Sequence, residues 1–189
     1  MNKTELRRTF SRQRATYTSG QLYHLGEAVT QQVVLHHLLD AFSVIHCFVG
    51  SVEKGEIGTE TLIRRILQDK KKLILPRICG ADSLEHIVTT DIDHLKKNSW
   101  GIDEPPPGNT VKPEEIELVF IPALAADYQG HRIGYGKGFY DRFLSQCPAH
   151  KVIIVPEAAL VDTIYPEAHD IPAHTIVTEK KVWHISKEK

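Results

Sequence analysis

Apolar residues recur at helical spacing in the N-terminal part of the chain. Leu6 and Phe10 lie four residues apart among basic and polar residues, which predicts a short amphipathic helix over residues 3–16. A second helix is predicted from a cap at Thr18 to about Leu39, because its apolar residues follow a period near 3.6. These residues are Leu22, Leu25, Val29, Val33, Leu35, Leu38 and Leu39. We expect the longer helix to pack on a sheet.

Short apolar runs without helical spacing follow this helix. Residues 43–49 and 72–76 are typical of buried strands, and residues 59–69 between them predict a helix capped by Thr59. The order strand, helix, strand suits a right-handed parallel crossover and therefore an α/β sheet. Further strands are predicted at residues 84–88, 118–121, 152–155, 175–177 and 182–185, with a helix at residues 139–146.

Two segments between these elements are predicted to be loops. Residues 50–58 form the first, and the second is a long stretch that contains Trp100-Gly101-Ile102 and the run Pro105-Pro106-Pro107-Gly108. Because loops of this length are usually functional or disordered, the second segment is a candidate part of a site.

The composition indicates one compact domain over residues 1–189. With 189 residues and 41% hydrophobic content, the chain is long enough for one buried core. The formal net charge of -1 gives no reason to expect a nucleic-acid or membrane partner. Residues 1–18 lack the apolar core of a secretory signal, so we expect a cytoplasmic protein, and a monomer is the default expectation.

Cysteine and histidine usage gives no metal signature. Cys47, Cys79 and Cys147 are far apart in the sequence, and we interpret them as reduced thiols, two of them buried. Among the eleven histidines, His36 and His37 are adjacent and would point about 100° apart on a helix. We therefore expect surface or packing histidines rather than metal ligands.

The segment from Gly130 to Arg142 carries most of the candidate chemistry. It follows a predicted strand, runs into a predicted helix and has glycines at three alternating positions, 134, 136 and 138. Glycines leave room for backbone N–H groups to face a phosphate, and a helix start adds the positive end of a dipole. Arg132 and Lys137 could bind phosphoryl oxygens, and Asp141 could hold Mg²⁺.

An ordinary glycine-rich turn is the alternative interpretation of this segment, with Asp141 merely stabilising a helix N-terminus. The spacing matches neither a P-loop nor a dinucleotide-binding glycine motif. The presence of two cations, a carboxylate and the aromatic residues Phe139 and Tyr140 in one loop favours an anion-binding site.

Residues 130–141, Gly-His-Arg-Ile-Gly-Tyr-Gly-Lys-Gly-Phe-Tyr-Asp, resemble the signature of the 5-formyltetrahydrofolate cyclo-ligase family. The resemblance extends to Lys3 and Arg7 near the N-terminus, to residues 99–102 around Trp100 and to residues 167–179. It implies a three-layer α/β/α sandwich with a largely parallel central sheet, similar to the sugar-phosphate isomerase and coenzyme A transferase-like fold. It also implies ATP-dependent conversion of 5-formyltetrahydrofolate to 5,10-methenyltetrahydrofolate, with Mg²⁺.

The resemblance assigns site residues by position. Those implied for ATP are Lys3, Arg7, Arg132, Ile133, Gly134, Tyr135, Gly136, Lys137, Gly138, Phe139 and Tyr140, and those implied for Mg²⁺ are Asp141 and Asp170. From the residues alone, Lys3 and Arg7 could equally form a solvated basic face. His169 and Asp170 could equally form a turn before Pro172.

For the folate, the resemblance implies Arg7, Val52, Glu56, Trp100, Tyr135, Gly136, Lys137, Gly138 and Phe139. A flat pterin ring needs an aromatic or apolar wall and a polar group that orients its nitrogens. Trp100 could instead be a core residue. The chain departs from the family pattern at Gly58, where many members have an acidic residue, and Glu56 is a candidate replacement. His174 and Ala126 are further departures, where members often have Asp and an aromatic residue.

Two other functions fit the sequence. An enzyme on the same scaffold could act on phosphorylated sugars without ATP, because a fold does not fix a function. A non-catalytic folate or nucleotide binder would bind its ligand without hydrolysing ATP. Phosphate release that depends on 5-formyltetrahydrofolate would exclude both.

Overall fold

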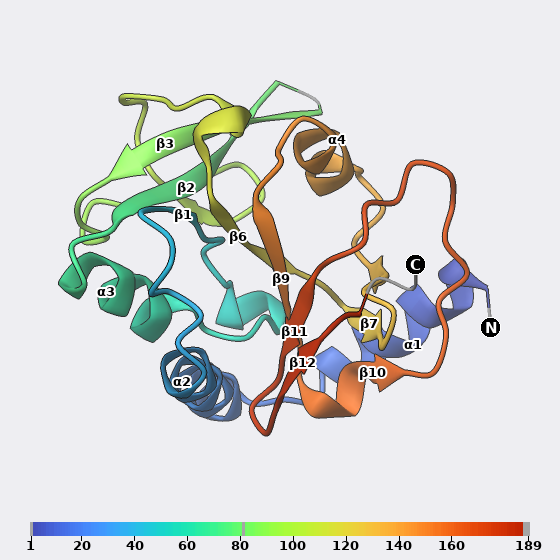
Figure 1. Ribbon diagram of the computed structural model, residues 1–189. Helices are drawn as coiled ribbons and strands as arrows, with labels where there is room; N and C mark the ends of the chain where they lie inside the picture. The colour runs from blue at the N-terminus through green and yellow to red at the C-terminus, as the bar shows by residue number, and fades with distance from the viewer. Residues whose placement is uncertain (1, 81, 187–189) are drawn as a thin grey trace.

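The structure, a computed structural model, describes residues 2–80 and 82–186 and is built on a central sheet of seven strands (Figure 1). The strands are β1 Val44–His46, β2 Lys72–Cys79, β3 Ser83–Thr89, β6 Leu118–Pro122, β9 His150–Ile154, β11 Thr175–Val177 and β12 Val182–His184. Their order is β12-β11-β9-β6-β1-β2-β3. The five middle strands are parallel and the two edge strands are antiparallel, which confirms a largely parallel sheet.

Helices cover both faces of this sheet, as in a three-layer α/β/α arrangement (Figure 1). Leu118 and Phe120 of β6 belong to the core on the side of α2 and α3, whereas Val119 and Ile121 belong to the core with residues of α1 and α4. This alternation follows from the two-residue period of a strand and explains the continuous apolar run. The helices are α1 Lys3–Arg14, α2 Ser19–Leu35, α3 Glu60–Gln68 and α4 Phe139–Ser145.

Two smaller sheets and three 3-10 helices complete the structure. One sheet has the order β10-β7-β8, and the other pairs two short strands in the long segment predicted as a loop. That prediction is therefore wrong for part of the segment, because the side chain of Asn98 accepts hydrogen bonds from the N–H groups of Trp100 and Ile102 and closes a hairpin. The strands are β4 Lys96–Lys97, β5 Asp103–Glu104, β7 Ala125–Asp127, β8 Arg132–Ile133 and β10 Leu160–Val161, and the 3-10 helices are η1 Val52–Lys54, η2 Pro113–Glu115 and η3 Glu157–Ala159.

Several predicted boundaries shift for local reasons. β2 continues beyond Pro76, since its pairing with β1 ends at Ile74 and only β3 lies beside Pro76, so the missing N–H breaks no ladder. The second helix ends at Leu35 instead of Leu39, and His37 takes a positive φ of 54° in the turn that follows. Thr59 precedes α3 without capping it through its side chain.

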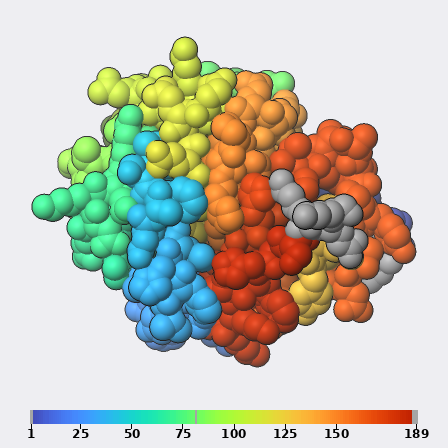
Figure 2. Space-filling model, viewed as in Figure 1, coloured from blue at the N-terminus to red at the C-terminus, as the bar shows by residue number. Residues whose placement is uncertain are grey.

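Segments from distant parts of the sequence share one surface. In the space-filling view, the blue segment at the end of α2 lies beside the red C-terminal strands, and α2 contacts β11 (Figure 2).

All three cysteines are free thiols, of which Cys47 and Cys147 are buried, as predicted. Among the described residues, no helix has the length and apolar content needed to cross a membrane.

Candidate active site

The glycine loop at residues 134–138 connects β8 to α4. Gly136 and Gly138 have φ angles of 86° and 69°, in the left-handed region that favours glycine. A Cβ atom at Gly136 would lie 3.4 Å from the guanidinium carbon of Arg7, so the missing side chain also lets this cation approach the loop backbone. Gly134 has neither constraint, and a Cβ there would meet open space.

Helix α1 brings two cations to this loop. Leu6 and Phe10 are buried in the core and fix the helix, while Lys3 and Arg7 lie one turn apart on another face. The Nε of Arg7 donates to the carbonyl of Gly134 at 2.8 Å, and the ammonium of Lys3 pairs with Asp170. These contacts argue against a solvated basic face, since the Lys3 side chain is only 16% exposed.

Arg132 connects the loop to two carboxylate-bearing segments. Its side chain is 6% exposed, and it donates to Oδ1 of Asp141 at 2.5 Å and to the carbonyl of Ile171 at 2.7 Å. Asp141 lies in the first turn of α4, and Ile171 follows Asp170. One guanidinium therefore joins both predicted metal-binding segments.

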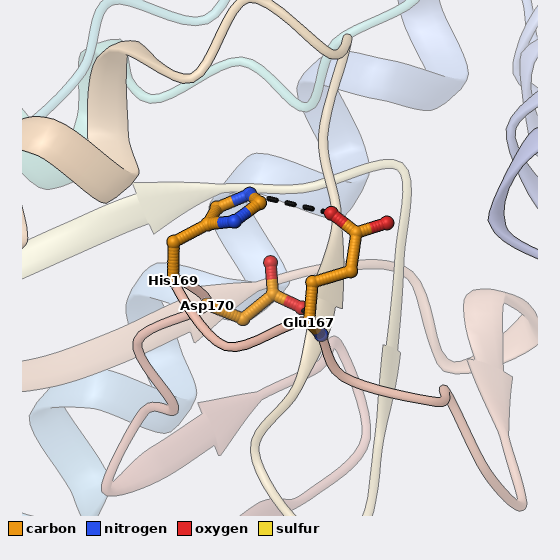
Figure 3. A group of neighbouring side chains, drawn as sticks. All are labelled: Glu167, His169 and Asp170. Carbon is orange, nitrogen blue, oxygen red and sulfur yellow. Dashed lines mark hydrogen bonds and ion pairs between the residues drawn. The ribbon is translucent and has the colours of Figure 1, made fainter.

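Asp170 belongs to a cluster with Glu167 and His169 (Figure 3). Its Oδ2 accepts the N–H of Glu167 at 2.6 Å, and the carboxylate of Glu167 lies 3.3 Å from Nε2 of His169. Burial opposes ionisation of Asp170, but the hydrogen bond and charge of Lys3, together with the Glu167 N–H, hold its pKa below the usual value. The predicted turn is therefore present, and it presents an ionised carboxylate.

The predicted metal residues fit Mg²⁺ by the chemistry of their donors. Carboxylate oxygens are the hard ligands that Mg²⁺ prefers, and it usually binds through one or two of them plus phosphate oxygens. Asp141 and Asp170 each lie beside a cation, Arg132 and Lys3 respectively. Paired opposite charges of this kind suit a metal–phosphate complex, because the carboxylates can bind the metal ion and the cations can bind the phosphate oxygens.

The remaining residues of the loop differ in what they expose. The side chain of Ile133 is buried in the core, whereas Lys137 is exposed and its carbonyl accepts a hydrogen bond from Arg142 at 2.8 Å. The ring of Phe139 lies 5.9 Å from the ring of Trp100, centroid to centroid. Trp100 is 42% exposed and is therefore not a core residue.

A cavity of about 320 Å³ lies next to the segment 49–60. Its volume is within the range of small-molecule sites. Val52, one of the predicted folate residues, lines this cavity, but Glu56 and Trp100 do not. The lining consists of Tyr23, Val49, Gly50, Ser51, Val52, Glu53, Gly58, Thr59, Glu60, Ile63, Arg64, Ile92, Leu95, Lys97 and Asp103.

Glu56 instead holds three segments together. Its carboxylate accepts the hydroxyl of Tyr135 at 3.1 Å and the N–H of Ser51 at 2.9 Å, and it lies 3.7 Å from Arg14. Arg14 also donates to the Tyr135 hydroxyl and to the carbonyl of Ala123. Burial and the charge of Glu56 raise the pKa of Tyr135 to about 12, so the hydroxyl stays protonated and donates.

The sequence analysis missed Arg14 and the role of Asp127. Asp127 is fully buried and accepts the N–H groups of Gln129, His131 and Ile164 at 3.0, 2.9 and 2.7 Å. It thereby fixes the hairpin before the glycine loop and the segment that leads to Asp170. An Asp three residues before a glycine is a recognisable turn signal, whereas nothing local in the sequence distinguishes Arg14.

Beneath the loop lies a buried cluster of rings. His46 contacts His86, Tyr140 and Phe143, with ring centroids between 4.9 and 6.1 Å apart. Neither nitrogen of His46 has a hydrogen-bond partner among the described residues. Burial lowers the pKa of His46 well below its usual value, and burial lowers that of His86 to about 4. His46 and His86 are therefore neutral packing residues.

Comparison with known proteins identifies the family. The family model described as the 5-formyltetrahydrofolate cyclo-ligase family matches residues 1–179. The chain belongs to this family. Its glycine loop, the α1 cations and the carboxylates at 141 and 170 all lie within the matched range.

Relatives of the cyclo-ligase family match over different lengths. A 5-formyltetrahydrofolate cyclo-ligase of Mus musculus is 31% identical over 66% of this chain, and the match spans 64% of that relative, a little under two thirds. The cyclo-ligase of Haemophilus influenzae is 28% identical over 93% of this chain and 94% of its own length.

A solved structure shares the whole fold. The 5,10-methenyltetrahydrofolate synthetase of Aquifex aeolicus has a TM-score of 0.87 and 28% identity, and the match covers 100% of this chain and 95% of that one. The corresponding enzyme of Mycoplasma pneumoniae, at 19% identity and a TM-score of 0.76, supports the fold alone.

Proposed function

We propose that this cyclo-ligase family member converts 5-formyltetrahydrofolate to 5,10-methenyltetrahydrofolate with cleavage of ATP to ADP and phosphate. The observation that carries the proposal is the convergence of Lys3, Arg7 and Arg132 with the carboxylates of Asp141 and Asp170 around one glycine loop. Such a set suits an ATP phosphate chain better than the phosphate of a sugar, which would leave the carboxylates without a role.

The reaction needs phosphate activation because a formamide oxygen is a poor leaving group. In the proposed first step the formyl oxygen attacks the γ-phosphorus, the bond to ADP breaks, and a phosphorylated formyl intermediate forms. In the second step N10 attacks the activated carbon and loses its proton, and phosphate departs with the former formyl oxygen. Holding N10 beside that carbon makes ring closure effectively intramolecular.

The chain's own residues have distinct roles in this proposal. Lys3, Arg7 and Arg132 bind phosphoryl oxygens and stabilise the charge that develops during transfer. Backbone N–H groups of the glycine loop bind the same oxygens, and the aromatic residues of the loop line the folate site. Asp141 and Asp170 would hold Mg²⁺, which when bound supplies further neutralisation of phosphate charge.

We infer that the folate binds in the cavity lined by Val52. The flat pterin would enter between α2, α3 and the β4–β5 hairpin, and the formyl group would face the glycine loop. One contact joins the hairpin to the start of α4: the ring centroids of Trp100 and Phe139 lie 5.9 Å apart with the ring planes tilted by 53°. At the cavity itself, Lys97 of the hairpin pairs with Glu53 at 2.5 Å. The proposal includes one monomeric cytoplasmic domain on a scaffold related to sugar-phosphate isomerases and coenzyme A transferases.

The test is product formation by the purified protein mixed with 5-formyltetrahydrofolate, ATP and Mg²⁺. We expect methenyl absorbance and phosphate release that require all three components, and loss of at least about 100-fold in rate for Asp141→Ala. The control is Asp162→Ala, which removes an exposed carboxylate from another loop. Binding of folate or ATP without any product would instead favour the non-catalytic binder.

A further inference from the structure

The cavity beside Val52 contains an aromatic residue that the sequence signature does not include. Tyr23 of α2 lines this cavity, and its side chain is half exposed, with 49% of the residue accessible. A half-accessible aromatic ring on a cavity wall leaves part of its face free to contact a flat ligand, and aromatic side chains of this kind commonly line small-molecule sites.

A close contact between two glycines fixes the position of Tyr23. A Cβ atom at Gly26 would lie 1.8 Å from the carbonyl oxygen of Gly58, so only glycine allows α2 to approach the segment 55–59 this closely. The N–H of Gly58 donates to the carbonyl of Leu22 at 3.2 Å and holds the same junction. The helix is thereby fixed with Tyr23, one residue after Leu22, directed to the cavity.

The missing side chain at Gly58 provides the space for the ring. A Cβ atom there would lie 3.2 Å from Cδ1 of Tyr23 and 3.4 Å from Cγ1 of Val52. The first of these distances is closer than ordinary van der Waals contact, so a larger residue at 58 would displace the tyrosine ring. Gly58 and Tyr23 therefore form one wall: the ring occupies space that a side chain at 58 would take.

The lining next to this wall is polar and mixed in charge. Glu60 and Arg64 form an ion pair at 2.8 Å on the first turns of α3, and Lys97 and Asp103 come from the β4–β5 hairpin. A flat heteroaromatic ring with hydrogen-bonding edges matches an aromatic wall bordered by such groups. By contrast, the carboxylate of Glu56 is already bound by Tyr135, Ser51 and Arg14.

We propose that Tyr23, whose ring occupies the space left by Gly58, is a substrate-binding and specificity-determining residue that stacks on the pterin ring of the folate. This inference rests on the proposed function, since the pterin comes from the proposed substrate. Stacking of the Tyr23 ring would hold the pterin ring in place, while the neighbouring polar groups orient the pterin nitrogens.

Steady-state kinetics of Tyr23→Ala and Tyr23→Phe test the proposal. Loss of an aromatic stack should raise the KM for 5-formyltetrahydrofolate by about tenfold in Tyr23→Ala and change the KM for ATP by less than about twofold. Tyr23→Phe keeps the ring and should stay within about threefold of the unaltered protein. The matched control is His24→Ala, an exposed neighbour on the same helix.

A second variant tests the coupling to Gly58. Gly58→Ala should raise the same KM by displacing the ring, and this effect should disappear in the background of Tyr23→Ala. If the two substitutions instead have independent effects on this KM, Gly58 and Tyr23 do not act as one wall.

The outcomes separate this inference from the proposed function. An inactive unaltered protein would refute the proposed function itself. An active protein whose folate KM is unchanged in Tyr23→Ala would refute the inference alone. A parallel rise in both KM values with a lower unfolding midpoint would indicate a packing role for Tyr23 and would equally refute it.

Discussion

On the glycine-loop side of the site, the three cations Lys3, Arg7 and Arg132 are held by carboxylates and backbone carbonyls. On the cavity side, the lining combines an aromatic ring, two glycines, several aliphatic side chains and two exposed ion pairs. The loop side is a continuous run of sequence with α1 laid against it, whereas the cavity side is assembled from α2, α3, η1 and the β4–β5 hairpin. The charged side of the site can therefore be recognised from a sequence motif, whereas the shape of the cavity follows only from tertiary packing.

The largest effect on activity is expected for Arg132→Ala, on the glycine-loop side of the site. Its side chain is 6% exposed, and its guanidinium bridges Asp141 and the carbonyl of Ile171. Removal would take away a cation that we propose binds phosphate and would leave a carboxylate unpaired, so we expect the rate to fall by about 100-fold or more and the KM for ATP to rise. Initial rates of methenyl formation at varied ATP would measure both.

Arg132→Lys is the matched control for this prediction. Lysine keeps the charge but has no planar fork to bridge two acceptors, so an intermediate rate is expected. Near-normal activity in Arg132→Ala, with the protein still folded, would show that this arginine only holds the loop and would remove it from the phosphate site.

The buried ring cluster of His46, His86 and Tyr140 should be sensitive to acid. Because the pKa of each histidine is lowered in the folded state, only the unfolded chain takes up protons just below the ordinary value near 6.5. Stability should therefore be complete above about pH 6.5 and fall as the pH drops towards 4. We expect a loss of about 1 kcal/mol or more between pH 7 and pH 5.

Urea unfolding at the two pH values measures this loss. His46→Phe replaces a ring that has no hydrogen-bond partner among the described residues by an apolar ring of similar size, so part of the pH dependence should disappear. His24→Ala, on an exposed helix face, should keep it. An unfolding midpoint that is equal at pH 7 and pH 5 would contradict a neutral buried cluster.

The same contrast explains which features could be predicted from the sequence. The parallel core strands were predictable because strands buried on both faces are apolar throughout, and the residues around Gly136 were predictable because they form one motif. The continuation of β2 past Pro76 was not, because it depends on where the neighbouring β1 stops. The exposure of Trp100 depends likewise on the turn that Asn98 closes.

The long-range contacts of the site were beyond local patterns. The clamp between Arg14, Glu56 and Tyr135 joins residues more than forty positions apart, and no periodicity marks them. Tyr23 has the same property, since its place on the cavity wall follows from the packing of Gly26 on Gly58. In both cases the sequence identified a residue type and the fold determined what it contacts.

The smallest expected effect concerns Glu56 and sharpens the comparison of the two sides. If Glu56 is a clamp, Glu56→Gln weakens a link between the glycine loop and the segment 51–56, and both KM values should rise together by about threefold. If its carboxylate binds the pterin, the KM for 5-formyltetrahydrofolate should rise alone. Gln keeps the shape of the side chain and one acceptor for the Ser51 N–H, so the change isolates the charge. Glu27→Gln is the control, because Glu27 is exposed and lies outside the cavity lining. A parallel rise in both KM values would place Glu56 between the two sides, whereas an isolated rise would move it into the cavity.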